Sequence, residues 1–236
     1  ALGANTTGAS NTAVGYQCLD ANTTGAALTA VGHTVLGANT TGYSNVAVGG
    51  GAPYLAAAMQ SNTTGYGNTA LGSGAMASNT TASSSTAVGR SAMYANSTGG
   101  NHVAVGNHAL KENTTGNTNT AVGVTALGLN TTGSNNTGLG YIAGDLITTG
   151  SNNTCLGYQA DPTGATVSNE FTLGNASVSA LRCADTSIAA LSDRRDKKDI
   201  IDSSYGLEFI NKIRPVQFTW DRRNLVEGDL ESIHNG

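Results

Sequence analysis

From residue 1 to about residue 160, short apolar segments alternate with turns rich in Asn, Thr and Gly. One unit reads NTTGNTNTAVGVTALGL, residues 113–129. Each unit holds two β-compatible pieces, such as Thr120 to Val122 and the pair Ala109-Leu110 of the preceding unit. Glycine and asparagine supply the positive φ of tight turns, and β-branched Thr and Val suit strands. The pattern predicts short strands joined by tight turns.

Two glycine series show that these units recur at a fixed period. The first follows the Ala-Val dipeptide or its equivalent, and the second ends Asn-Thr-Thr-Gly or its equivalent. In both series successive members are 17 residues apart, except for one step of 23 residues in each series. In the first series this longer step leads from Gly49 to Gly72. Two marks in register indicate nine coils and one six-residue insertion. A fixed period this short is typical of a solenoid, whose units bury their faces by stacking.

Seventeen residues are too few for a helical-hairpin repeat, so we predict an all-β, parallel β-solenoid (β-roll) shaft. Nine coils about 4.8 Å apart would span roughly 40 to 45 Å. So narrow a coil can bury few apolar side chains, and self-association is a common remedy for insufficient burial. We therefore expect a homotrimer. The residues expected in the core are Val14, Val48, Val88, Val105, Val122, Leu19, Leu36, Met93, Leu110 and Leu127.

The N-T-A-V-G-x-x-A-L units resemble the head repeats of trimeric autotransporter adhesins, which form a left-handed parallel β-roll. They also resemble repeats of phage tail fibres. The resemblance covers residues 1–160 and implies a trimeric appendage. A triple-stranded β-helix of intertwined chains is the alternative fold.

Charge divides the chain into parts. Of the 11 Lys and Arg residues, eight lie in 192–236, together with nine of the 15 Asp and Glu residues. Such asymmetry marks a boundary. We predict a shaft over 1–160 and a β-rich transition segment over 161–191, with strands at Phe171-Thr172-Leu173 and at Val178-Ser179-Ala180-Leu181. A separate small α+β module is expected over 192–236. No apolar run is long enough to span a bilayer, so membrane insertion is not expected.

Little in the repeats points to chemistry. Cys18 and Cys155 stand where other units have Ala, so they are expected to be small buried residues, and with Cys183 they form no metal-binding spacing. His33, His102 and His108 are interpreted as solvated surface side chains. No metal and no cofactor are expected.

In eight repeats, the asparagine of the Asn-Thr-Thr-Gly turn or its equivalent begins an Asn-x-Ser/Thr sequence. These asparagines are interpreted as structural turn residues rather than glycan acceptors. These are Asn5, Asn22, Asn39, Asn62, Asn79, Asn96, Asn113 and Asn130.

The insertion falls near residues 52–57 and contains Pro53 and Tyr54. An interruption on one face of a regular solenoid is often a partner-binding site, and equally often a tolerated bulge or bend. Both interpretations of Pro53 and Tyr54 remain open.

The segment LSDRRDKKDI, residues 191–200, and the later GLEFINKIRPVQFTW resemble the start of the peptidase S74 domain, the intramolecular chaperone of endosialidases and tail fibres. The resemblance implies trimerisation followed by self-cleavage at Leu191-Ser192. Ser192 would be the nucleophile and Lys197 the base of a Ser-Lys dyad. The alternative is a charged helix start with Ser192 as its N-cap.

The chain departs from that family by stopping at Gly236, before a downstream glycine-rich segment that ends in Gln-Glu. We expect either a fragment or a relic that cannot cut. Because the chain also opens inside a repeat without Met, we expect a longer parent chain upstream.

The sequence thus predicts a structural fibre of a virion, similar to a phage tail fibre, that binds a host surface receptor or glycan and contacts other virion or tail proteins. No turnover enzyme and no nucleic-acid partner are expected. A bacterial trimeric surface adhesin is the alternative. An autoproteolytic membrane-bound transcription factor would need a DNA-binding domain, and the solenoid carries little positive charge.

Overall fold

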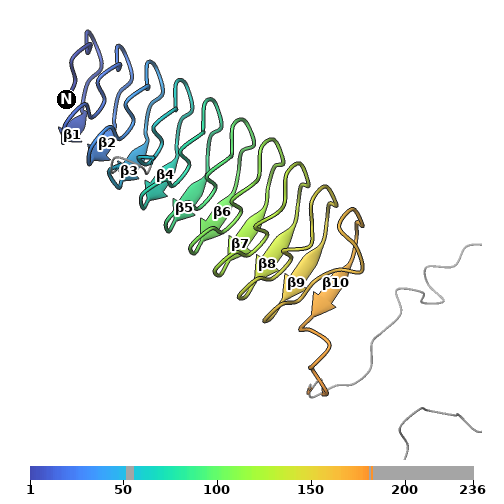
Figure 1. Cartoon of the computed structure of the whole chain (residues 1–236). Helices are drawn as coiled ribbons and strands as arrows, with labels where there is room; N and C mark the ends of the chain where they lie inside the picture. The colour runs from blue at the N-terminus through green and yellow to red at the C-terminus, as the bar shows by residue number, and fades with distance from the viewer. Residues whose placement is uncertain (52–55, 181, 183–236) are drawn as a thin grey trace, which may run out of the picture. The chain divides into compact units, whose positions relative to one another are not determined.

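The computed structural model describes residues 1–51, 56–180 and 182. Within the compact unit Ala1–Leu181, ten three-residue strands form one parallel sheet in chain order, and each coil stacks on the next (Figure 1). The strands are β1 (Thr12–Val14), β2 (Thr29–Val31), β3 (Val46–Val48), β4 (Thr69–Leu71), β5 (Thr86–Val88), β6 (Val103–Val105), β7 (Thr120–Val122), β8 (Thr137–Leu139), β9 (Thr154–Leu156) and β10 (Phe171–Leu173). The predicted all-β parallel solenoid is confirmed.

The register of the sheet follows the sequence period. Thr120 of β7 pairs with Thr137 of β8, seventeen residues later. Across the insertion, Val46 of β3 pairs with Thr69 of β4 in the same alignment. The extra residues therefore leave the sheet uninterrupted, and each coil is closed within a single chain.

Residues 178–180 form no strand, so the prediction of a strand from Val178 to Leu181 is wrong over its described part. The strand predicted at Phe171–Leu173 is present. This strand, β10, pairs with β9 and lies seventeen residues after Thr154, although its coil lacks the Asn-Thr-Thr-Gly turn. The sheet thus continues past residue 160.

Tight turns depend on residues with positive φ. Gly123 follows β7 with a φ of 138°, which L-residues rarely adopt, and a Cβ there would collide with the carbonyl oxygen of Gly140 on the next coil. Leu127, which is not glycine, also has a positive φ of 50°. Its N–H donates to Ala143 O at 2.9 Å, so the neighbouring coil holds this strained residue in place.

The apolar part of the core is built from three columns of buried side chains that run from coil to coil. The central residue of most strands, usually Ala, points inward, and behind it lie a column of small residues and a column of Leu or Met. The prediction for Leu19, Leu36, Met93, Leu110 and Leu127 is confirmed, because all are fully buried. Cys18 and Cys155 are likewise buried as expected.

The prediction that the strand valines fill the core is wrong. Val14, Val48 and Val105 are 57%, 37% and 36% exposed, and Val88 and Val122 are only half-buried. Successive side chains of a strand point to opposite faces, so the inward Ala sends both of its neighbours outward. The narrow interior, already occupied by Leu, Met and Asn, has space there only for a small side chain.

A first column of asparagines runs through the interior. Asparagines at equivalent positions of successive coils are joined by hydrogen bonds. Nδ2 of each asparagine after Asn5 donates to Oδ1 of the asparagine one coil earlier, over 2.7–3.3 Å. Nδ2 also donates to the carbonyl of the glycine or alanine three residues on. Its members are Asn5, Asn22, Asn39, Asn62, Asn79, Asn96, Asn113 and Asn130. From Asn22 onward these side chains are fully buried, which agrees with a structural role.

A second polar column precedes the strands, and it contains His102. In this column Asn119 Oδ1 accepts the Asn136 N–H at 2.9 Å. His102 occupies the equivalent position one coil earlier, where its Nδ1 accepts the Asn119 N–H at 3.1 Å. The interpretation of His102 as a solvated histidine is wrong, because this side chain is only 1% exposed. Burial lowers its pKa to about 4.

Candidate assembly interface

The outer face of the sheet carries a continuous apolar column. The third residue of every strand is Val or Leu and points away from the core. Five members of this column, Val14, Val48, Leu71, Leu139 and Leu173, are 37–57% exposed. An ordered apolar surface that repeats on every coil is unusual for a chain that stays alone in water.

The first residue of each strand forms a parallel column on the same face. It is Thr in seven strands, Val46 in β3, Val103 in β6 and Phe171 in β10, and these three side chains are 37%, 41% and 64% exposed. None of the ten strands contains a charged residue. This uncharged sheet face could pack against another apolar surface without burying an unpaired charge.

Two aromatic stacks lie at separate places on the surface, one before β3 and β4 and one after β8 and β9. Tyr43 and Tyr66 stack with ring centroids 4.9 Å apart and an interplanar angle of 1°. Tyr141 and Tyr158 stack in the same way at 5.5 Å. All four rings are at least 44% exposed, so each stack offers an accessible aromatic surface.

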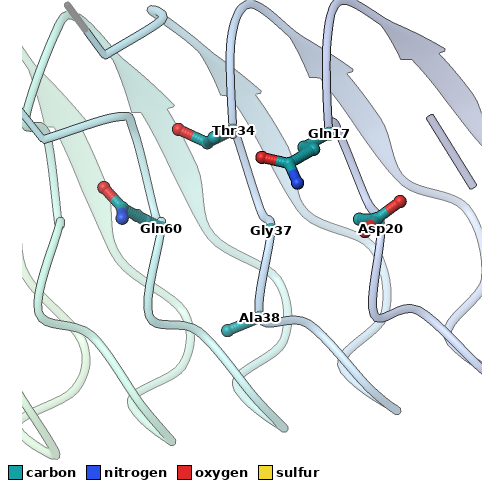
Figure 2. Close-up of a pocket in the computed structure, with 6 residues that line it drawn as sticks. All are labelled: Gln17, Asp20, Thr34, Gly37, Ala38 and Gln60. Atoms are coloured by element: carbon teal, nitrogen blue, oxygen red, sulfur yellow. The ribbon is translucent and has the colours of Figure 1, made fainter. Parts of the chain in front are cut away.

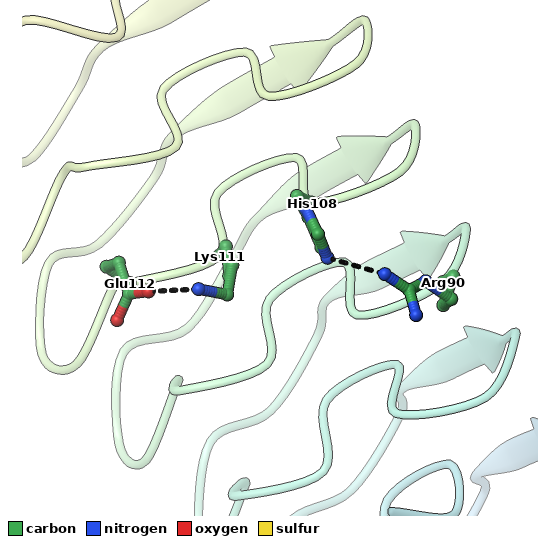
Figure 3. A network of polar contacts seen from close by, with 4 residues as sticks. All are labelled: Arg90, His108, Lys111 and Glu112. Atoms are coloured by element: carbon green, nitrogen blue, oxygen red, sulfur yellow. Dashed lines mark hydrogen bonds and ion pairs between the residues drawn. The ribbon is translucent and has the colours of Figure 1, made fainter. Parts of the chain in front are cut away.

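Charged side chains gather on two neighbouring coils (Figure 3). Arg90 Nη2 lies 3.4 Å from His108 Nε2, and Lys111 forms an ion pair with Glu112. Burial, with the positive charges of Arg90 and Lys111, lowers the pKa of His108. As expected, His108 lies at the surface, where it is half-buried, and His33 is exposed. No arrangement of nucleophile and base is formed by these four residues.

The residues predicted to cleave the chain, Leu191, Ser192 and Lys197, lie outside the described residues. Pro53 and Tyr54 of the insertion do as well, and so does Cys183. Their assigned roles remain predictions.

Two searches cover only the described part of the chain. Over residues 1–51, 56–180 and 182, no cluster of three or more His, Cys, Asp or Glu side chains is arranged to hold a metal ion. The same residues include no helix with the length and apolar character to cross a membrane.

The comparison with known families identifies the C-terminal segment. Residues 192–236 match the sequence profile of the Peptidase S74 family, described as the chaperone of endosialidase. Together with the parallel solenoid, this match fits a phage tail fibre with a C-terminal chaperone. It implies a trimeric protein of the tail-spike or tail-fibre type. No curated protein and no solved structure matches the chain.

Proposed function

We propose that this chain is the shaft of a homotrimeric virion fibre, similar to a phage tail fibre, whose role is host attachment. The chaperone match at 192–236 supports the viral and trimeric parts of the proposal. The observation that carries it furthest is the uncharged Val/Leu column on the outer face of the sheet, because it repeats on every coil.

In the proposed trimer, the outer sheet face of each chain packs against the other two copies. Burying one partly exposed Val or Leu contributes about 1 kcal/mol, so ten per chain supply a substantial driving force. The Thr column beside them provides small side chains that allow close approach. A slim solenoid would thereby gain the core that a single chain lacks.

The C-terminal segment would direct this assembly and then be released. In this proposal the Ser192 hydroxyl oxygen attacks the carbonyl carbon of Leu191 while Lys197 accepts the hydroxyl proton. The C–N bond then breaks, Lys197 passes the proton to the departing Ser192 amine, and the Leu191 acyl group remains on the Ser192 oxygen as an ester. Water then hydrolyses the ester and regenerates the Ser192 hydroxyl. Long-range β-assemblies fold slowly and expose sheet edges, which explains why such a shaft would need a chaperone.

The bacterial surface adhesin has only the likeness of its head repeats in its favour. The chaperone match at 192–236 favours the viral fibre.

Sedimentation of the full chain tests the assembly. The wild type should sediment at three times the mass of its own chain, which is 23.6 kDa when residues 192–236 remain attached and less after cleavage at Leu191-Ser192. A Val105→Asp/Val122→Asp variant, which places charges on the outer sheet face of adjacent coils, should shift toward the chain mass. The matched control is Thr98→Asp/Thr115→Asp, which adds the same charges to exposed turn residues of those coils and should remain trimeric.

A monomeric wild type would overturn the trimer. A variant that assembles as fully as the wild type would overturn the outer sheet face as the interface.

A further inference from the structure

A polar groove crosses three consecutive coils near the N-terminal end of the described solenoid. Its volume is about 300 Å³, and Gln17, Asp20, Thr34, Gly37, Ala38 and Gln60 line it (Figure 2). Gln17 and Asp20 follow β1, Thr34 and Gly37 follow β2, and Gln60 follows β3. The groove thus lies on the segments after the strands rather than on the strands themselves.

The groove exists because Gly37 has no side chain. One coil earlier the equivalent residue is Asp20, and one coil later it is Gln60. The three atoms nearest to a Cβ added at Gly37 all belong to the backbone, and the closest are Thr34 O at 3.1 Å and Gln17 O at 3.6 Å. No side chain from the next coil covers this position.

The equivalent glycine Gly128 shows the contrast. There the Asp145 carboxylate of the next coil leans over the glycine, with Oδ1 2.8 Å from the place a Cβ would occupy. Gln60 does not cover Gly37 in this way, because its Oε1 accepts the Ala57 N–H at 3.1 Å. Figure 2 shows the Gln60 amide turned away from Gly37, whereas the Gln17 amide extends toward it. One hydrogen bond therefore keeps the groove open.

An aromatic stack lies next to this groove in the chain. Tyr16 and His33 directly precede Gln17 and Thr34, and their rings stack with centroids 5.3 Å apart at an interplanar angle of 20°. Tyr16 is 67% exposed, and His33 is also exposed. The two exposed rings thus form an apolar platform one residue along the chain from the polar residues Gln17 and Thr34 of the groove, and small-molecule sites typically combine apolar and polar groups.

This chemistry suits a sugar. The Gln17 amide, which extends toward Gly37, can bind hydroxyl groups as an acceptor or a donor. The Asp20 carboxylate borders the groove but leans toward the preceding coil, with Oδ1 2.7 Å from the place a Cβ of Gly3 would occupy. Thr34 Oγ1 donates to His33 O at 2.8 Å, which leaves this oxygen free as an acceptor. The C–H face of a pyranose ring is apolar and can cover an aromatic ring. Asp20 supplies the only charge in the lining, so a carboxylated or phosphorylated sugar would be repelled.

We propose that this groove binds a neutral saccharide, with one sugar ring over the Tyr16–His33 stack and its hydroxyl groups bonded to the Gln17 amide and to Thr34 Oγ1. This inference rests on the proposed function in host attachment and names neutral saccharides as the class of host ligand. Gly37 is the specificity-determining residue, because any larger side chain there would fill the groove.

The test uses the full chain on an array of oligosaccharides that holds neutral hexose chains and their sialylated counterparts, followed by calorimetric titration of the neutral chain that is retained best. The wild type should retain a neutral chain in preference to its sialylated counterpart. Gly37→Gln should lower the affinity at least tenfold. Gly37 does not have a left-handed φ, so the coil can accept a side chain there, as it does at Asp20 and Gln60.

The matched control is Lys111→Gln, which places the same side chain at the equivalent position of a distant coil and should bind like the wild type. Tyr16→Ala provides a second variant, since this exposed ring can be removed without opening the core, and it should also weaken binding. Retention of no neutral chain, preference for sialylated chains, or wild-type affinity of Gly37→Gln would overturn the proposal. Sedimentation of the same samples separates this failure from failure of the trimer.

Discussion

Asn113 donates a hydrogen bond from Nδ2 to Oδ1 of Asn96, the residue one coil earlier, over 2.7 Å and at full burial. Asn113 Oδ1 accepts in turn from Asn130 Nδ2 at 2.9 Å. Each interior asparagine is thus a donor to one coil and an acceptor for the next. Polar side chains therefore link successive coils in an interior whose apolar residues are few.

Replacing Asn113 with Ala should destabilise the shaft by about 2–4 kcal/mol. The change removes three hydrogen bonds, with Asn96 Oδ1, Gly116 O and Asn130 Nδ2, and leaves the buried Asn130 amide without one acceptor, which costs more than the lost bonds alone. Urea unfolding followed by circular dichroism measures the loss. Asn107→Ala is the control, because Asn107 lies outside both columns and should cost less than about 0.5 kcal/mol. Equal losses in the two variants would show that the column is not a main source of stability.

Protonation of His102 should make the shaft sensitive to acid. Burial lowers the pKa of His102 from 6.5 to about 4 in the folded chain, so between these values the unfolded chain binds more protons. The stability contributed by neutral His102 is full above pH 6.5 and is lost as the pH falls toward 4, by about 3 kcal/mol. Thermal unfolding between pH 4 and pH 7 should show this loss.

His102→Asn restores the residue type found at Asn119 and should flatten that pH dependence. His33→Asn, a change at an exposed histidine, should leave it as in the wild type. A wild type with constant Tm over this range would contradict the buried, neutral state of His102.

The inward orientation of the strand alanines predicts a strong asymmetry between the two faces of the sheet. Ala104→Val adds two methyl groups to a filled interior and should cost about 1–3 kcal/mol through overpacking. Thr120→Val, a change of similar shape on the outer face, should stay within about 0.5 kcal/mol. Urea unfolding of both variants compares them. If Thr120→Val proved the more damaging change, the assignment of inner and outer faces would be reversed.

Asp145 should lower the stability of its coil at neutral pH. Its Oδ1 is buried and has no hydrogen-bond partner among the described residues. Burial, with the nearby charge of Asp161, raises the pKa of Asp145. Since a raised acid pKa means that the charged form is disfavoured in the folded chain, Asp145→Asn should raise the Tm at pH 7 and have less effect at pH 3. A lower Tm at pH 7 would argue against this destabilising charge.

Self-cleavage at Ser192 can be read from the mass of the purified product. Expressed from the full-length gene, the wild type should end at Leu191, and Ser192→Ala should remain whole. Lys197→Ala should also remain whole, since it removes the proposed base, whereas Lys198→Ala should be cut. If the wild type and Ser192→Ala are both uncut, Ser192 is no nucleophile and the adhesin alternative gains equal rank.

The fold was predictable because its signals are local and repeated. Gly123 and its equivalents mark a turn that glycine favours, and the common step of 17 residues fixes the parallel register. The sequence also shows an asparagine such as Asn113 at the start of most turns. Its hydrogen bond to Asn96 could not be predicted, because that bond requires a buried side chain and the turn motif does not specify burial.

The orientation of the strands was not predictable from alternation alone. Alternation places Ala104 and Val105 on opposite faces, but only the width of the interior decides which of them points inward. His102 could have been recognised, because it stands seventeen residues before Asn119. The groove at Gly37 had no such signal, since it depends on the hydrogen bond that Gln60 makes to Ala57.

Because each strand pairs only with adjacent strands, the length of the shaft can change by gain or loss of whole repeats in the gene. Every described strand pairs only with the strands before and after it, and β3 and β4 stay aligned despite their longer connection. A duplication of 51 nucleotides would therefore insert one more coil, add about 4.8 Å of reach and leave both ends unchanged. Recombination between repeats could tune how far such an appendage extends without redesigning any contact.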